Sequence, residues 1–131
     1  MNYNWNDKKI LIVDDEQLIH FFYKEIFKET GANLLHATDG RTSVSICKEN
    51  EDLDIVLMDI HLPNLNGYEA LSEIRKFNHD VPIIAQTAFA LSEDRDTALK
   101  AGFDEYVSKP INKSEVKQII EFFFFKKKVL M

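Results

Sequence analysis

Acidic residues directly follow two of the most apolar segments of the chain. Asp14 and Asp15 come after residues 10–13, Ile-Leu-Ile-Val, and Asp59 comes after residues 55–58, Ile-Val-Leu-Met. Converging carboxylates repel one another, so such a cluster persists where a cation neutralises it or protons are taken up. Oxygen ligands without Cys or His suit a hard ion, Mg²⁺ or its substitute Mn²⁺, which can also bind a phosphate oxygen. These acids are therefore candidate ligands for Mg²⁺.

A hydroxyl and an ammonium group follow two later apolar segments. Thr87 comes shortly after residues 81–85, and Lys109 follows residues 103–107. Both groups can stabilise the charge on the equatorial oxygens of a phosphoryl group in transfer. With two acids holding the metal, Asp59 can attack phosphorus in line and form an aspartyl phosphate. Asp59, Thr87 and Lys109 are the candidate catalytic residues.

Each candidate also has an ordinary structural role. The acids at positions 14–16 precede a predicted helix and can cap its N-terminus, where the helix dipole favours negative charge. Asp59 precedes a segment rich in Pro, Asn and Gly, residues 63–67, which is typical of a turn. Taken singly, these roles are the more common ones. The phosphoryl hypothesis depends on all the candidates meeting at one place.

Short apolar segments alternate with amphipathic ones along the whole chain. Strands are predicted at residues 10–13, 34–37, 55–58, 81–85 and 103–107. Helices are predicted at residues 17–30, 42–48, 68–76, 92–101 and 114–124. This alternation predicts an α/β fold, a doubly wound five-stranded parallel sheet with five helices covering both faces. All strands then end at one edge, where a ligand crevice forms and where the candidate residues would meet.

Composition limits the class of protein. A chain of 131 residues with 45% hydrophobic content predicts one domain with one core. The net charge of −6 disfavours direct nucleic-acid binding, because phosphates would be repelled. Cys47 is the only cysteine, which excludes an internal disulfide. No apolar run approaches the ~20 residues of a membrane span, so we expect a soluble, cytoplasmic protein without membrane contact.

Together, these motifs resemble the receiver domain of two-component response regulators over residues 9–124. The resemblance rests on four blocks of sequence, residues 14–15, 58–67, 87–88 and 106–110. It implies a flavodoxin-like fold with strand order 2-1-3-4-5. The receiver domain would span residues 9–125, with an N-terminal lead at residues 1–8 and a C-terminal tail at residues 126–131.

The resemblance implies a role for each candidate. Asp59 would receive a phosphoryl group from a phosphohistidine on a histidine kinase or a histidine phosphotransfer protein. Asp15 would bind Mg²⁺ directly and Asp14 mostly through water. Asp59 itself and the backbone carbonyl of His61 would complete the metal ligands. Lys109 would pair with Asp59 before transfer and with the phosphoryl group afterwards.

The resemblance also implies a switch. Thr87 would move to bond the phosphoryl group, and Tyr106 would turn inward into the space it leaves. This movement would alter the surface of the helix at 92–101, the strand at 103–107 and the helix at 114–124, which is also a possible homodimer contact.

Three further features follow from the family's pattern. The peptide bond between Lys109 and Pro110 is typically cis. His61 and Phe89 occupy places that control the access of water to the phosphoryl group, so their rings predict a long-lived phosphorylated form. For His61 the alternative is a solvated loop side chain that contributes only its carbonyl. The helix at 17–30 commonly docks the partner's phosphohistidine helix, and its apolar residues at positions 21 and 27 lie beyond the core stripe. Looser core packing is the alternative explanation for those two residues.

The parent protein and the activity have alternatives. Residues 84–90 and 101–106 look most like receivers of hybrid sensor histidine kinases, although a stand-alone receiver is also compatible with the chain. Phosphatases of the haloacid-dehalogenase type also use an Asp nucleophile after a strand, but they need a second Asp where this chain has His61. An interaction module independent of phosphorylation is disfavoured because no site residue is missing. We therefore expect a phosphoacceptor, with self-phosphorylation and autodephosphorylation only, and not a true enzyme.

Overall fold

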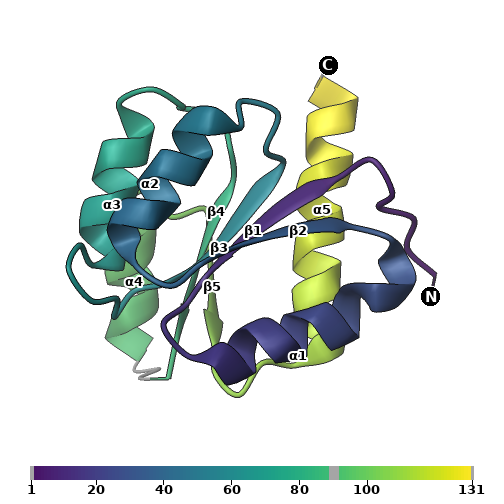
Figure 1. Ribbon diagram of the computed structural model, residues 1–131, viewed down its shortest axis with the longest axis horizontal. Coiled ribbons are helices and arrows are strands. Elements are labelled where there is room, and N and C mark those ends of the chain that lie inside the picture. The colour runs from purple at the N-terminus through teal and green to yellow at the C-terminus, as the bar shows by residue number, and fades with distance from the viewer. Residues whose placement is uncertain (1, 89–91, 131) are drawn as a thin grey trace.

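A five-stranded parallel sheet forms the centre of the protein, and its strands follow the order β2-β1-β3-β4-β5 (Figure 1). The computed structural model describes residues 2–88 and 92–130. The strands are β1 Lys9–Val13, β2 Asn33–Ala37, β3 Ile55–Asp59, β4 Ile83–Thr87 and β5 Glu105–Ser108. The helices are α1 Gln17–Phe27, α2 Gly40–Glu49, α3 Gly67–Arg75, α4 Ser92–Ala101 and α5 Lys113–Leu130. The predicted fold class and strand order are confirmed.

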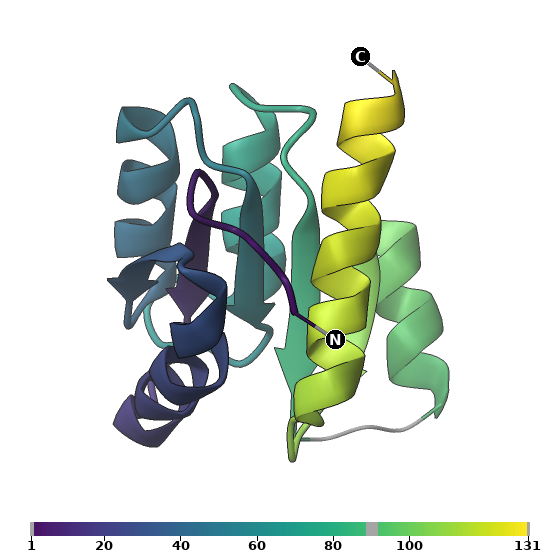
Figure 2. The ribbon, with the colours of Figure 1, turned by 90° about the vertical axis from the view of Figure 1, so that its right-hand side faces the viewer.

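Helices cover both faces of the sheet, α1 and α5 on one side and α2, α3 and α4 on the other (Figures 1 and 2). Successive side chains of a strand point to opposite faces, so each strand contributes to both layers of the core. In β1, Ile10 and Ile12 pack toward α1 and α5, whereas Leu11 and Val13 pack toward the other layer. This two-sided burial explains why the central strands are continuously apolar instead of alternating.

The bounds of several elements differ from the sequence prediction. The first helix was expected to reach residue 30, but α1 ends at Phe27 and a 3-10 turn, η1 Lys28–Thr30, follows. Gly31 then ends the turn at a φ of 78°. A side chain at position 31 would be strained at this φ, and its Cβ would also lie 1.9 Å from the Asn6 side-chain oxygen. The N-terminal segment is thereby packed closely against the end of α1.

The N-terminal residues 2–8 contribute to the core. Trp5 is 1% exposed and contacts the rings of Phe27 and Phe124 edge-on. Its indole N–H donates to Glu121 Oε2 at 2.6 Å, and its backbone N–H donates to the Thr30 carbonyl at 2.7 Å. The segment expected as a lead therefore supplies one of the largest buried side chains of the protein.

Helix α5 is longer than expected and runs along the whole height of the molecule (Figure 2). Residues 126–130, which were expected as a tail, continue this helix.

None of the helices in the described part of the chain combines the length and the hydropathy that a membrane span needs.

Replacing Trp5 by Ala should lower the free energy of unfolding by about 3 kcal/mol, because a large buried ring is lost and a cavity is left. Urea unfolding measures this difference. Leu18→Ala is the matched control, since Leu18 is 78% exposed and its loss should cost less than about 0.5 kcal/mol. Equal effects of the two substitutions would show that residues 2–8 are not part of the folded core.

Candidate functional site

The order of the strands brings the three acids together. β1 and β3 are neighbours with Val13 opposite Met58, so the acids that follow these residues lie side by side at the carboxyl edge of the sheet. Asp14, Asp15 and Asp59 each offer a carboxylate oxygen within 4.8 Å of the others. Asp14 is fully buried, Asp59 is 4% exposed and Asp15 is exposed to solvent. The expected convergence of the acids is present in the structure.

Lys109 enters the same cluster from the loop after β5. Its ammonium nitrogen lies 2.8 Å from Asp14 Oδ2 and 3.3 Å from Asp59 Oδ2. The pairing of β4 with β5 places this loop, because Lys109 donates its backbone N–H to the Thr87 carbonyl at 2.8 Å. The Lys109–Pro110 bond is cis, as expected from the resemblance. Thr87, the last residue of β4, is buried at the same edge of the sheet.

The loop that follows Asp59 folds back tightly on it. The His61 backbone N–H donates to Asp59 Oδ1 at 2.9 Å, and the Gly67 N–H donates to the Ile60 carbonyl at 2.9 Å. A Cβ on Gly67 would lie 2.6 Å from the Asp59 carbonyl oxygen, so glycine is required for this approach. Asn66 then caps α3 in a capping box with Glu69. This loop orients the Asp59 carboxylate, while the His61 side chain is exposed.

The electrostatics of the site are dominated by burial and by the shared lysine. Burial raises the pKa of Asp59, and the neighbouring Asp14 raises it further, whereas the His61 N–H and Lys109 oppose this shift. Burial opposes the charge on Lys109, but its bonds to Asp14 and Asp59 outweigh that effect and raise the pKa of the lysine. Lys109 therefore stays an ammonium ion at neutral pH and partly neutralises the acids.

The donor set fits a hard divalent cation. The Lys109 ammonium is the positive charge paired with Asp14 and Asp59, it also lies 3.7 Å from Glu16, and Asp15 adds a further carboxylate, so acidic groups outnumber the cation. The converging donors are all oxygens, with one carboxylate open to solvent, which suits an ion that retains water ligands. Asp14, Asp15 and Asp59 are thus the side chains that could hold Mg²⁺.

Two predicted residues remain, Tyr106 and Phe89, and the structure describes only Tyr106. Tyr106, on β5, is 9% exposed and packs in the core layer beside α2, α3 and α4. Burial and the Asp94 carboxylate raise the pKa of Tyr106, so its hydroxyl stays protonated. Phe89, expected to shield the phosphoryl group, lies outside the described residues.

The family model described as "Response regulator receiver domain" matches residues 10–121. The chain belongs to this family. Homologues of this receiver include both hybrid sensor kinases and response regulators. It is 32% identical to the sensor histidine kinase RcsC of Escherichia coli over 88% of its own length, which is 12% of the kinase. The chain spans about 45% of the length of the transcriptional regulators among its relatives.

Solved receiver structures share the fold. The receiver of a Pseudomonas aeruginosa sensor histidine kinase, with a magnesium ion coordinated in its active site cleft, is 35% identical. The TM-score is 0.80, and the match covers 88% of this chain and 96% of that one. The yeast receiver of Ssk1, crystallised with the phosphotransfer protein Ypd1, matches with a TM-score of 0.79, 29% identity and 86% coverage of both chains.

A buried polar network behind Asp14 was missed by the sequence prediction. Gln86 Nε2 donates to Asp14 Oδ2 at 3.1 Å, and His20 Nε2 lies 2.7 Å from the Asp14 backbone oxygen. His20 also bonds His36 through their Nδ1 atoms at 2.7 Å. The available signal was Gln86 itself, an amide within an apolar strand directly before Thr87. The receiver thus holds Asp14 from behind as well as from the site.

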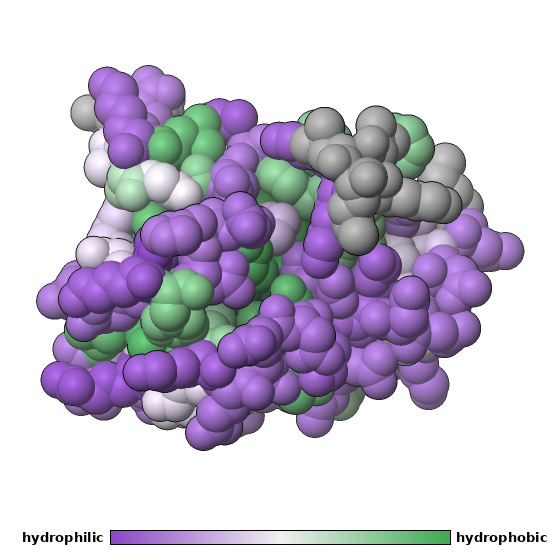
Figure 3. Space-filling view, turned by 90° about the horizontal axis from the view of Figure 1, so that it is seen from above, coloured by the Kyte–Doolittle hydropathy of each residue, from purple (hydrophilic) through white to green (hydrophobic). Residues whose placement is uncertain are grey.

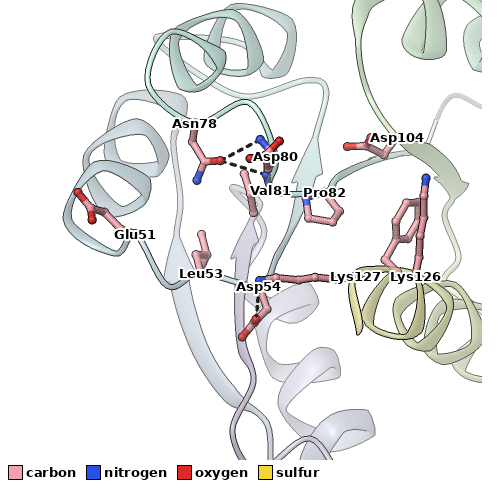
Figure 4. A pocket seen from close by; sticks show the side chains of 11 residues that line it. Glu51, Leu53, Asp54, Asn78, Asp80, Val81, Pro82, Asp104, Lys126 and Lys127 are labelled. Carbon is pink, nitrogen blue, oxygen red and sulfur yellow. Dashed lines mark hydrogen bonds and ion pairs between the residues drawn. The ribbon is translucent and has the colours of Figure 1, made fainter. Parts of the chain in front are cut away.

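The opposite edge of the sheet carries a separate cleft of about 620 Å³ (Figure 4). Leu53, Pro82 and Phe123 are among its apolar lining residues, and Asp54 pairs with Lys127 across it at 3.5 Å. Seen from above, this end of the receiver is mostly hydrophilic, with smaller hydrophobic areas between (Figure 3). None of the candidate site residues lines the cleft, so it is distinct from the acidic site.

Asp59→Asn should stabilise the receiver at pH 7 in the absence of divalent ions. The folded-state pKa of Asp59 is raised, so the folded state binds its proton more tightly. Stability from this group therefore falls as pH rises from the ordinary pKa of Asp, about 3.9, through the raised value. Removing the charge should raise Tm by roughly 3 °C, or about 1 kcal/mol.

Thermal unfolding in EDTA and in Mg²⁺ measures this effect. Millimolar Mg²⁺ should stabilise the wild-type chain more than Asp59→Asn and so reduce or reverse the difference, because the ion binds the folded acidic site. A variant that is less stable than wild type in EDTA at pH 7 would contradict the assigned charge balance.

Proposed function

We propose that this receiver accepts a phosphoryl group on Asp59 from the phosphohistidine of a histidine kinase or a histidine phosphotransfer protein. The observation that carries the proposal is the position of the Lys109 ammonium, which is shared by the buried carboxylates of Asp14 and Asp59 beside the exposed Asp15. A nucleophile, a cation and an opening for a divalent ion thus lie at one edge of the sheet. Residues 9–125 are the proposed receiver unit.

The chain's own residues would divide the work of transfer. One Asp59 oxygen attacks phosphorus as the bond between phosphorus and the imidazole nitrogen of the donor breaks. The His61 N–H holds the other oxygen, and Lys109 moves its charge toward the new phosphoryl oxygens. Bound Mg²⁺, held by Asp14, Asp15, Asp59 and the His61 carbonyl, would supply further neutralisation of those oxygens.

The proposed output is a shift between two arrangements of the surface. Thr87 would bond the phosphoryl group through its hydroxyl, and Tyr106 would follow by moving farther inward. Both side chains belong to β4 and β5, next to α4 and α5. The surface formed by α4, β5 and α5 is accordingly the proposed contact for a partner or for a second receiver.

The proposed receiver could belong to either of two kinds of parent protein, a sensor histidine kinase or a response regulator. RcsC, a sensor histidine kinase, supports a receiver segment that passes its phosphoryl group to a phosphotransfer protein. The Ypd1 complex of Ssk1 supports docking to such a protein. The transcriptional regulators among the relatives support a receiver that controls an attached or separate output. A cytoplasmic location is part of the proposal in each case.

Phosphorylation is tested directly with a small donor. Incubation with Mg²⁺ and acetyl phosphate should add one phosphoryl group, seen by intact-protein mass spectrometry, and Asp59→Asn should abolish the gain. EDTA should suppress it by at least about tenfold, since the acids then repel the donor. Steady release of inorganic phosphate without accumulation would instead indicate a phosphatase, and no reaction would leave only an interaction module.

Helix α1 offers a docking surface for the donor. Leu18 and Phe21 are 78% and 63% exposed near the start of the helix, which begins directly after the acids. For Phe27 the alternative of core packing is confirmed, because this ring is 1% exposed and packs on Trp5 and Tyr23. The proposed docking surface is therefore limited to Leu18 and Phe21.

Phe21→Ala should slow phosphotransfer from the cognate protein donor by about tenfold, because an exposed aromatic anchor is lost. Its phosphorylation by acetyl phosphate should stay at the wild-type rate. Phe77→Ala is the matched control, since Phe77 is 40% exposed but follows α3, outside both α1 and the surface formed by α4, β5 and α5. Wild-type transfer rates for Phe21→Ala would place the docking surface elsewhere.

A further inference from the structure

A chain of hydrogen bonds joins the hydrophobic core to the acidic site. The Tyr23 hydroxyl, on α1, donates to Gln86 Oε1 at 2.6 Å, and Gln86 Nε2 donates to Asp14 Oδ2 at 3.1 Å. The exposed fractions of these residues are 0% for Tyr23, 1% for Gln86 and 0% for Asp14. The chain is therefore shielded from water along its whole length, where each bond matters more than at a surface.

The chemistry of the three groups fixes the direction of the chain. An ionised carboxylate only accepts hydrogen bonds, so the NH₂ group of Gln86 must face Asp14. The amide oxygen then faces Tyr23 and needs a donor. Burial and the nearby Asp14 charge raise the pKa of Tyr23, so its hydroxyl keeps the proton it donates. Tyr23 thus locks the amide of Gln86 in the one orientation that suits Asp14.

Asp14 is held by donors from three separate segments. Its Oδ1 accepts a hydrogen bond from the Glu16 N–H at 2.9 Å. Its Oδ2 accepts one from Gln86 Nε2 at 3.1 Å and one from the Lys109 ammonium at 2.8 Å. Gln86 pairs with Asp59 in the register of β3 and β4, so the amide comes from the strand beside the phosphoacceptor. The position of Asp14 Oδ2, and with it that of Lys109, therefore depends on Gln86.

We propose that Gln86, oriented by Tyr23, is a positioning residue that sets the geometry of Asp14 and Lys109 and thereby the affinity of the acidic site for a divalent cation. The effect on phosphorylation rests on the proposed function above, but the effect on cation binding does not. Without the amide, Asp14 Oδ2 would keep only Lys109 and could turn away from Asp15. Partners that orient metal ligands from behind commonly change affinity by about 10- to 100-fold.

Binding of Mn²⁺, followed by electron paramagnetic resonance, tests the proposal without any phosphorylation. Gln86→Met keeps the volume of the side chain and removes the amide, and it should weaken Mn²⁺ binding by about tenfold. Tyr23→Phe should weaken it by roughly threefold, because the amide can then rotate. In the double variant Tyr23→Phe should have no further effect, since its influence passes through Gln86. Tyr68→Phe, which alters a tyrosine whose ring contacts Phe103 edge-on, is the control and should bind as wild type.

The outcomes separate positioning from general stability. Wild-type Mn²⁺ affinity in Gln86→Met would overturn the proposal, and so would an equal effect of Tyr23→Phe with and without Gln86. If Gln86→Met does not fold, Gln86→Leu and Tyr23→Phe are compared under the same criterion, with urea unfolding to confirm that each is native. A receiver that binds Mn²⁺ but gains no phosphoryl group would refute the proposed function. The positioning role of Gln86 would still be decided by the Mn²⁺ affinities of the variants.

Discussion

Two buried carboxylates share one ammonium group, and this pairing requires the whole order of the sheet. Lys109 comes from the loop after β5, Asp14 from the end of β1 and Asp59 from the end of β3. Buried charges are tolerated only when they are paired and hydrogen-bonded, so all three loops must arrive in register. β4 lies between β3 and β5 and sets the distance that the lysine must span. An error in strand order would leave charges without partners.

The apolar core supplies the rigidity that this charge cluster needs. The residues of β1 from Ile10 to Val13 are fully buried, and those of β3 are no more than 4% exposed. Helices on both faces hold these strands (Figure 1), and the site residues sit at the carboxyl ends of the strands or directly after them. The packing of these buried strands therefore holds the acids in place against their mutual repulsion. The site is left with excess negative charge that a divalent ion can neutralise.

Much of the fold and most of the site could be predicted from strand ends alone. Asp14, Asp59 and Lys109 follow apolar strands, and parallel strands deliver their carboxyl ends to one edge whatever the details of packing. The errors lie where tertiary contacts outweigh local pattern. Phe27 is an exception: it lies four residues after Tyr23, on the buried face of α1, so the helical period alone favoured its burial, and Trp5 packs against it there. Trp5 itself lies in a polar segment in which no periodicity indicates burial.

The sequence by itself determined the alternation of strands and helices, the polar residues that come after the apolar segments and the chemistry those residues can perform. These properties are local, since they depend on the period of apolar residues and on side-chain type. Only the tertiary structure decided that Tyr23, Gln86 and Asp14 form one chain, because their partners are 63 and 72 positions apart along the sequence. A buried amide must find its donor and acceptor in space, and no single segment shows where they are.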